Sequence, residues 1–259
     1  MKIVVCVKYV PDPASQPRFT AGHTVDRENV PGRLSELDEY AVEQALRVVD
    51  AAPDTHVTHL TVGPPQAAEA LRRALAMGGH AAVHVSDDAL AGSDASATAL
   101  VLAAALRRLT PDLVLCAMAS TDGGTALVPA MLAEHLELPQ LTFATEVSVD
   151  AGTVRVRREA VQATEELAAE LPALVSVTDR IGDPRYPSFK GIMAAKKKSL
   201  QTWTLADLGV PADQVGAGAA RTVVDEITAR PPRAAGTAVQ DDGEGAWHLA
   251  EFLATKKFI

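Results

Sequence analysis

Short apolar runs alternate with amphipathic stretches along the chain as far as residue 136. Four of the apolar runs have the composition and length of buried strands, at residues 3–7, 57–62, 81–85 and 112–116. Between them apolar residues recur at helical spacing, and each connection is long enough to hold a helix. This alternation predicts a doubly wound α/β domain, with a mostly parallel sheet covered by helices on both faces.

The connection after the first strand has two further features. Residues 14–33 are polar with scattered Gly and Pro, and they are too long for a simple connection. Long irregular insertions in compact domains are usually functional or mobile. Ser35-Glu36-Leu37-Asp38 follows with the pattern of a capping box, so we expect a helix whose third N–H is bound by the Ser35 side chain.

Beyond residue 136 the pattern changes from helix–strand alternation to strands alone. Residues 142–149 and 153–157 alternate around Asp150-Ala151-Gly152, which predicts a hairpin. Residues 164–171 have helical composition but the length of a strand, so both interpretations stay open. With a buried strand at 173–177, we expect the sheet to gain an antiparallel edge.

Regularity fades from Asp179 onward. The chain therefore divides into an α/β domain over residues 1–182, a segment over 183–198 and an extended C-terminal arm over 199–259. In the 183–198 segment aromatic and apolar residues stand between turn formers, a pattern typical of a contact surface. The arm has little core material of its own, so we expect it to lie on another surface.

Composition narrows the classes of protein. The 259 residues carry a formal charge of −9, which argues against nucleic acid as the main partner. No apolar run reaches the roughly 18 residues of a membrane-spanning helix, and the N-terminal run lacks a cleavage site. We therefore expect a cytoplasmic protein without a membrane span. In that compartment Cys6 and Cys116, both in strand-like runs, are expected to be buried free thiols.

The loop at residues 117–125 is the stretch most suggestive of a ligand site. Its small and polar residues open into a helix, where backbone N–H groups can approach an anion. Ligands of parallel sheets bind at the carboxyl ends of the strands. The loop after Cys6-Val7 and the Gly63 turn therefore face the same crevice, and Ser35 and Asp38 join them if the insertion folds back.

The sequence motifs do not support a catalytic function. Asp122 suits a ribose hydroxyl or a backbone donor better than a bare phosphate. The loop around it is neither a Walker A sequence nor a Gly-x-Gly-x-x-Gly fingerprint, so NTP hydrolysis and nicotinamide binding lack support. His56 and His59 would point to opposite faces of a strand, and no histidine spacing suits a metal. We expect no catalytic residues in this chain.

Five stretches resemble one known family, and the likeness covers almost the whole chain. They are Ile3 to Asp12, Asp38 to Ala45, Ala74 to Gly78, Asp112 to Leu115 with the Ala119-Ser120-Thr121-Asp122 loop, and Pro184 to Lys198. The last run, which includes Pro184-Arg185-Tyr186-Pro187-Ser188-Phe189 and ends in Lys196-Lys197-Lys198, is the most specific. In these residues the chain resembles the beta (small) subunit of an electron transfer flavoprotein.

The resemblance implies a Rossmann-like fold of the adenine-nucleotide-binding type and a heterodimer. An alpha subunit would hold the redox FAD, while this subunit would bind AMP as a structural nucleotide and pack its arm, residues 199–259, on the alpha subunit. Such a pair accepts electrons from flavin dehydrogenases, such as the acyl-CoA dehydrogenases of fatty acid oxidation. It passes them to the respiratory chain through a quinone oxidoreductase. The beta subunit would be an electron carrier without catalytic residues of its own.

The family's binding residues carry over by position. Backbone groups of Cys6 and Val62 would hold the adenine edge, and the loop with its helix start would hold the phosphate. The implied AMP contacts are Cys6, Ser35, Glu36, Leu37, Asp38, Val62, Asp122, Gly123, Gly124, Thr125, Ala126 and Val128. The implied partner-binding residues are Tyr186, Phe189, Ile192, Met193, Lys196 and Lys197. Phe189 would enter a pocket of the dehydrogenase, and the lysines would steer acidic partners.

Two departures from the family pattern bear on these expectations. Leu127-Val128-Pro129-Ala130 stands where many members have Gln-Val-Gly-Pro, and Pro129 places the expected helix start near Thr125. Glu159 matches a glutamate that lies near the partner subunit's flavin in relatives. Here Ala160-Val161-Gln162 replaces the Asp-Gly-Gly that usually follows it.

Two alternatives stay open. An electron-bifurcating flavoprotein would carry a second FAD in place of AMP and take electrons from NADH, and Gly123 and Gly124 do not exclude it. A stand-alone nucleotide-binding enzyme or sensor of the same fold would be stable and active without a partner.

Overall fold

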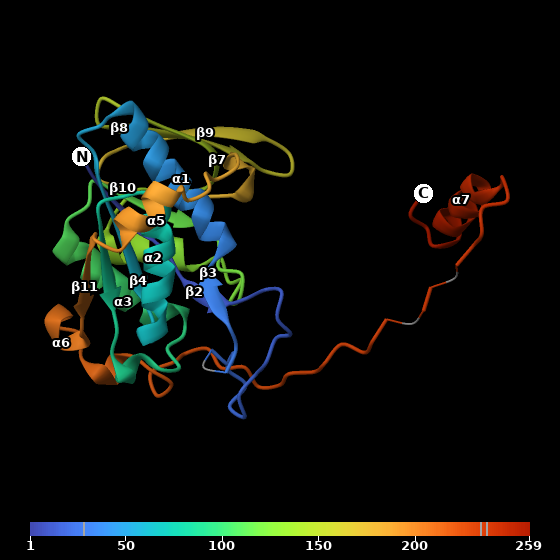
Figure 1. Ribbon diagram of the computed structural model, residues 1–259, viewed down its shortest axis with the longest axis horizontal. Coiled ribbons are helices and arrows are strands. Elements are labelled where there is room, and N and C mark those ends of the chain that lie inside the picture. Colours follow the sequence, from blue (N-terminus) through green and yellow to red (C-terminus); the bar gives the residue numbers. More distant parts are fainter. Residues whose placement is uncertain (28, 234, 237) are drawn as a thin grey trace. The chain divides into compact units, whose positions relative to one another are not determined.

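The computed structural model describes residues 1–27, 29–233, 235–236 and 238–259. The chain forms two compact units, Met1–Asp225 and Glu226–Ile259, which are described separately. The first unit contains the sheets and all helices but the last (Figure 1). In the described part of the second unit the chain forms the helix α7 (Gly245–Thr255).

A nine-stranded sheet forms the centre of the first unit, in the order β11-β5-β4-β1-β6-β10-β7-β8-β9. Its strands are β1 (Lys2–Cys6), β4 (His56–Val62), β5 (Ala81–Val85), β6 (Leu113–Ala117), β7 (Gln140–Asp150), β8 (Thr153–Glu159), β9 (Thr164–Glu170), β10 (Ala173–Val177) and β11 (Ser199–Trp203). All neighbours pair in parallel except β7 with β8 and β8 with β9. A small antiparallel sheet joins β2 (Tyr9–Pro11) to β3 (Gly32–Leu34). The predicted fold class is confirmed.

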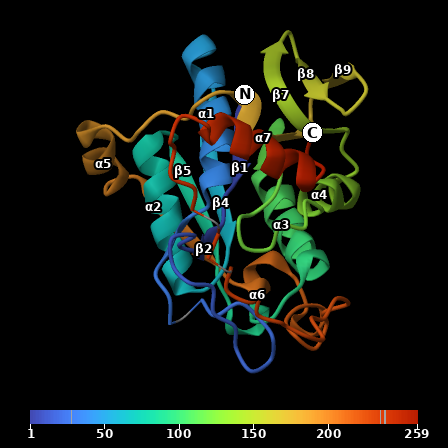
Figure 2. The same ribbon diagram turned by 90° about the vertical axis from the view of Figure 1, so that its right-hand side faces the viewer.

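Helices cover both faces of the central sheet, as Figure 2 shows for α1 and α2 on one side and α3 and α4 on the other. The helices of this unit are α1 (Glu36–Ala51), α2 (Ala68–Met77), α3 (Ala95–Leu109), α4 (Val128–Leu136), α5 (Phe189–Ala195) and α6 (Leu205–Leu208). Short 3-10 turns lie at η1 (Pro65–Ala67), η2 (Asp88–Leu90), η3 (Asp179–Ile181) and η4 (Ala212–Gln214). The side chain of Asp94 caps α3 by accepting from the N–H of Ala97 at 2.9 Å.

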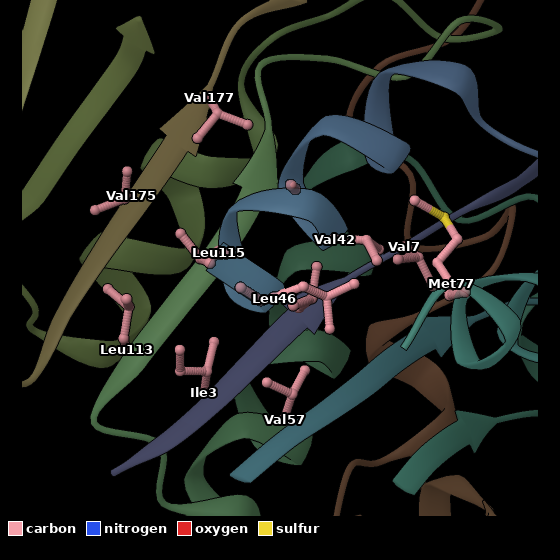
Figure 3. Packing of buried hydrophobic residues seen from close by; sticks show 14 of the residues in the cluster. Ile3, Val7, Val42, Leu46, Val57, Met77, Leu113, Leu115, Val175 and Val177 are labelled. Carbon is pink, nitrogen blue, oxygen red and sulfur yellow. The ribbon is translucent and has the colours of Figure 1, made fainter. Parts of the chain in front are cut away.

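The core is built in two layers because side chains of a strand alternate between faces. Ile3 and Val5 of β1 pack against the layer under α1 and α2, and Val4 packs against the layer under α3 and α4. Figure 3 shows the first layer, where strand side chains meet Val42 and Leu46 of α1. Each fully buried Val or Leu contributes about 1.5–3 kcal/mol, so these layers hold the carboxyl ends of the strands rigidly in place.

The antiparallel edge forms as predicted. β7 and β8 make the hairpin, and its turn uses Ala151 and Gly152, both with positive φ. Residues 164–170, left open between helix and strand, form β9. Their side chains alternate in exposure, and Leu167 and Ala169 pack on the core while Glu166 and Glu170 face solvent. Burial of one face outweighs the helical composition.

The predicted start of the C-terminal arm at residue 199 is wrong. Ser199–Trp203 is β11, which pairs in parallel with β5, and Trp203 is buried in the core. The boundary between the two units falls after Asp225. The strand is at the edge of the sheet and buries only Trp203 fully, so its sequence lacks the apolar run of a central strand.

Two helix starts also differ from the expectation. Ser35 is the N-cap of α1, but its side chain makes no cap hydrogen bond. The capping box fails because the N–H of Ser35 donates to the Lys8 carbonyl at 3.0 Å and the Asp38 carboxylate accepts from the N–H of Lys8 at 2.7 Å. α4 begins at Val128 rather than near Thr125, so that Pro129 lies in its first turn, where proline is favoured.

Candidate functional site

A cavity of about 440 Å³ opens at the carboxyl ends of β1, β4 and β6. From β1 the chain runs to β4 on one side, and after β5 it returns to place β6 on the other. The cavity therefore lies where the strand order reverses, the usual ligand position in open α/β sheets. Its walls come from four strand-to-helix connections and from the insertion that carries Arg27.

Apolar side chains and two thiols line the part of the cavity nearest the sheet. Cys6 and Val62 end β1 and β4 there, Cys116 is the last residue but one of β6, and Leu102 of α3 adds to this wall. Val5 of β1 pairs with Leu115 of β6, so the two cysteines that follow are neighbours on adjacent strands. Both are free thiols, but only Cys116 is fully buried. A hydrogen bond to the Cys6 thiol and burial raise the pKa of Cys116, which keeps it protonated.

Charged side chains form a cluster beside the cavity. Lys8 Nζ lies 2.8 Å from Asp122 Oδ1 and 3.3 Å from Ser120 Oγ, and the Arg27 guanidinium also pairs with Asp122. The Asp122 side chain is only 5% exposed. Burial alone would raise its pKa, but Lys8 and Arg27 outweigh burial and hold the pKa well below its usual range. Asp122 thus accepts from two cations of this chain, and its expected contact with a ribose hydroxyl or a backbone donor stays a prediction.

The same cluster leaves positive charge toward the cavity. Lys8 and Arg27 share one carboxylate, and both line the cavity wall. Arg27 Nη1 is buried and has no hydrogen-bond partner among the residues that the structure describes. A buried guanidinium nitrogen without an acceptor is costly, so this position suits an anionic group of a ligand.

Asp38, in the first turn of α1, provides a buried carboxyl group beside the Lys8 backbone. It lines the cavity and accepts a hydrogen bond from the N–H of Lys8 at 2.7 Å. Burial raises the pKa of Asp38 to about 8, so the group carries its proton at neutral pH. A protonated carboxyl group can donate a hydrogen bond to a ligand.

The loop between β6 and α4 contributes small residues to the wall. Ser120 holds it in shape, because its Oγ accepts from the N–H of Gly123 at 3.2 Å and its carbonyl from the N–H of Gly124 at 3.0 Å. Gly124 and Ala126 have positive φ, and this turn leads the chain into α4. The first N–H groups of α4 have no partner within the helix, as at any helix N-terminus.

The structure brings together seven of the twelve predicted nucleotide contacts. Cavity-lining residues among them are Cys6, Asp38, Val62, Gly123, Thr125, Ala126 and Val128. The others lie outside the cavity wall: Ser35, Glu36, Leu37, Asp122 and Gly124. The Ser35 hydroxyl is nevertheless buried, with no hydrogen-bond partner in the described part of the chain.

Sequence reasoning missed Lys8, Arg27 and the connection between β5 and α3, where Ser93 and Asp94 line the cavity. The rule that ligands meet the carboxyl ends of strands could have indicated the connection after β5. For Arg27 the only signal was the unusual length of the insertion.

The 183–198 segment forms the helix α5 and carries the predicted partner-binding side chains on its outside. Tyr186 is 90% exposed and Phe189 is 82% exposed, with Ile192 and Met193 exposed beside them. Lys196 and Lys197 are exposed at the end of α5. The structure confirms that these apolar side chains are exposed.

Glu159 ends β8, and its carboxylate accepts from Arg180 Nη1 at 2.5 Å. Among the described residues no three His, Cys, Asp or Glu side chains gather as a metal site would require. Within the same residues, no helix has both the length and the apolar character needed to cross a bilayer.

Known proteins are similar to this chain along almost its whole length. Residues 22–208 match the family model of the electron transfer flavoprotein domain. The chain is 44% identical over 263 residues to the electron transfer flavoprotein subunit beta of Mycobacterium tuberculosis, with 99% of both chains covered. It is 36% identical over 270 residues to the subunit beta of Megasphaera elsdenii, and 35% identical over 262 residues to the caffeyl-CoA reductase-Etf complex subunit CarD of Acetobacterium woodii. Both of these alignments cover 100% of both chains.

Proposed function

We infer the function of this chain from its family. The chain belongs to the electron transfer flavoproteins and aligns along its whole length with their beta subunits. The chain therefore serves electron transfer, and the name of its relatives implies an alpha subunit as partner. We also propose which ligand the cavity binds and which proteins dock on the surface of the chain.

We propose that the cavity between β1 and β6 holds AMP as a structural nucleotide. The main supporting observation is that one cavity has both an apolar wall, at Cys6, Val62 and Cys116, and two cations, Lys8 and Arg27. Of these cations, Arg27 has a buried nitrogen with no hydrogen-bond partner among the described residues. An adenine suits the apolar wall, and a phosphate suits the cations and the nearby start of α4. The protonated Asp38 adds a hydrogen-bond donor at the same wall.

In this proposal the chain's contribution to electron transfer is positional. FAD, held mainly by the alpha subunit, would supply the redox chemistry. The residues of this chain would hold the nucleotide, shape the subunit and present the 183–198 segment to flavin dehydrogenases and to a quinone oxidoreductase. An exposed aromatic such as Phe189, beside lysines, suits an apolar pocket with an acidic rim.

The second unit, Glu226–Ile259, supports an alpha subunit as the permanent partner. Trp247, Leu249 and Phe252 of α7 are all more than half exposed, and so are Phe258 and Ile259 after it. Five exposed apolar side chains on and just after one short helix are typical of a surface that a partner covers. We propose that this unit packs on the alpha subunit and that the heterodimer works in the cytoplasm.

Anaerobic mixing of the purified heterodimer with a substrate-reduced acyl-CoA dehydrogenase tests the role as an electron carrier. We expect the flavin absorbance of the heterodimer to bleach, and this chain expressed alone to accept no electrons. A chain that is monomeric and catalytic by itself would contradict the proposal and favour a stand-alone enzyme. Reduction by NADH, with a second flavin present, would favour the bifurcating alternative.

A further inference from the structure

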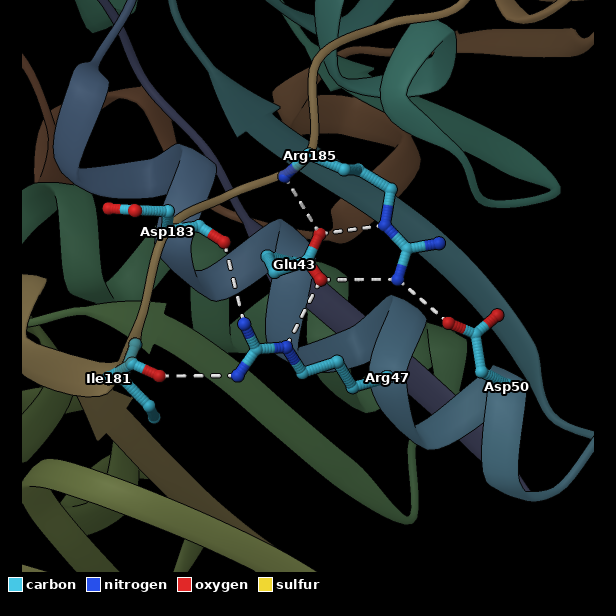
Figure 4. Close-up of polar contacts among 6 residues, drawn as sticks. All are labelled: Glu43, Arg47, Asp50, Ile181, Asp183 and Arg185. Atoms are coloured by element: carbon cyan, nitrogen blue, oxygen red, sulfur yellow. Dashed lines mark hydrogen bonds and ion pairs between the residues drawn. The ribbon is translucent and has the colours of Figure 1, made fainter.

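The backbone leading into the 183–198 segment is tied to α1 through one buried carboxylate. The Glu43 side chain is 6% exposed and accepts four hydrogen bonds (Figure 4). Arg185 donates three of them, from its backbone N–H at 3.1 Å, from Nε at 2.7 Å and from Nη2 at 3.1 Å. Arg47 Nε donates the fourth at 3.1 Å.

Three side chains on one face of α1 extend this contact along the segment. Glu43, Arg47 and Asp50 are four and three residues apart, so they point the same way. Asp50 accepts from Arg185 Nη2 at 2.7 Å. Arg47 donates to the carbonyls of Ile181 at 3.2 Å and Asp183 at 3.4 Å. The chain is therefore held at three successive points as it leaves the sheet after β10.

The other end of the segment is tied to α2. Arg72 Nη1 donates to the carbonyls of Ala195 at 2.7 Å and Lys198 at 3.1 Å. Lys198 Nζ donates in turn to the carbonyl of Leu75 at 2.9 Å. Between these ties α5 lies directly against α2, since a Cβ at Gly191 would come within 2.3 Å of the Ala76 carbonyl oxygen.

The aromatic side chains between the two ties have no core of their own. Tyr186 follows Arg185 directly, and Phe189 is the first residue of α5, whose N-cap is Ser188. Their position is thus set by the backbone on either side. The Arg185 hydrogen bonds outweigh burial and lower the pKa of Glu43, so the carboxylate stays charged and the contact persists at neutral pH. A buried ion pair gives little net stability but can select one conformation.

We propose that Glu43 and Arg185 are positioning residues that hold Tyr186 and Phe189 in their docking geometry before a partner arrives. This inference rests on the docking role proposed above. A segment that is already ordered loses little conformational entropy on binding, which favours fast and reversible contact with a redox partner. Neither residue lines the cavity at the carboxyl ends of β1, β4 and β6, so we expect their loss to act on the 183–198 segment and to leave the cavity intact.

Hydrogen exchange followed by mass spectrometry on the purified heterodimer tests the positioning directly. In Glu43→Gln we expect backbone amides of residues 183–198 to exchange at least tenfold faster, while those of α3 and α4 keep their rates. Glu39→Gln is the matched control, because Glu39 lies one turn earlier on α1 and pairs with Arg73 instead. Arg185→Lys keeps the charge but loses the forked contact, so an intermediate rate is expected.

Steady-state kinetics with an acyl-CoA dehydrogenase gives the functional readout. We expect Glu43→Gln to raise the KM for the dehydrogenase several-fold with kcat and AMP content unchanged. Unchanged exchange in residues 183–198, or equal acceleration throughout the chain, would overturn the positioning role whatever the KM. Faster amide exchange confined to residues 183–198, with an unchanged KM, would support the contacts with α1 but would contradict the docking role of the segment. If Glu43→Gln fails to fold, Arg185→Lys and Asp50→Asn provide the same comparison.

Discussion

Lys8 Nζ lies 2.8 Å from Asp122 Oδ1, and this ion pair joins the connection after β1 to the loop after β6. Arg27, from the long insertion, binds the other oxygen of the same carboxylate. Three segments distant in sequence therefore meet at one buried acid beside the cavity. Asp122 holds the two cations together, and both cations line the cavity.

Removing the charge of Asp122 should destabilise the fold at neutral pH. In Asp122→Asn the amide group faces at least one of the two cations with a donor, so we expect a loss of about 1–3 kcal/mol in the free energy of unfolding. The folded-state pKa of Asp122 lies well below its ordinary value of 3.8, so its contribution is present above about pH 4 and fades as pH falls further. Urea unfolding at several pH values measures this difference.

The matched control for Asp122 is Asp12→Asn, because Asp12 faces Arg33 at 4.0 Å in a more exposed pair. We expect this variant to change stability by less than about 0.5 kcal/mol. Equal stability of Asp122→Asn and the native chain at pH 7 would contradict the organising role of Asp122.

Arg27 should contribute to nucleotide affinity, although it lies in the insertion and outside the family motif. Loss of a charge-assisted hydrogen bond costs about 1.5–3 kcal/mol, so Arg27→Gln should raise the Kd for AMP about tenfold or more. Titration calorimetry on the AMP-depleted heterodimer measures this. Arg18→Gln, an exposed arginine of the same insertion, should leave the Kd unchanged. If both variants bind AMP as the native protein does, the open nitrogen of Arg27 does not face the ligand.

Asp38 should make stability fall as pH rises. The folded chain keeps the proton up to about pH 8, whereas an unfolded aspartate loses it near pH 4, so folding becomes less favourable between these values and levels off above. Asp38→Asn can still accept from the N–H of Lys8 but cannot ionise. We expect its stability relative to the native chain to increase from pH 5 to pH 8, measured by urea unfolding. Glu36→Gln on the same turn removes an exposed carboxylate and serves as the control. A pH-independent difference for Asp38→Asn would contradict the burial argument.

Phe189 should act as the main docking anchor. Truncating an exposed aromatic that fills a partner pocket costs about 2 kcal/mol or more, so Phe189→Ala should raise the KM for a reduced dehydrogenase more than tenfold. AMP content and assembly with the alpha subunit should stay unchanged. Val161→Ala removes another fully exposed apolar side chain, between β8 and β9, and serves as the control. An unchanged KM in Phe189→Ala would count against the anchor.

The parallel core could be predicted from sequence because its strands are continuous apolar runs. Ile3 to Val5 and Leu113 to Leu115 are buried on both faces, so their composition alone identifies them. β9 could not be assigned by composition, since its Ala and Glu favour a helix. Its pairing with β8, in which Leu167 lies opposite Val156, identifies it as a strand.

The features that were missed depend on contacts between distant residues. Arg27 and Asp122 are 95 positions apart, and nothing in the polar insertion marks Arg27 as the residue that returns to the cavity. β11 is mixed in polarity because it is an edge strand with one buried side chain. Ser35 satisfies the local pattern of a capping box, but the backbone of Lys8 occupies the groups that the box would use.

The number and identity of nucleotides released from the denatured heterodimer test the central claim most directly. Chromatography of the released nucleotides, with absorbance spectra, counts each species per heterodimer. We predict one AMP from the cavity between β1 and β6 and one FAD from the alpha subunit, with AMP content lowered by Arg27→Gln. Two FAD molecules and no AMP would contradict this prediction.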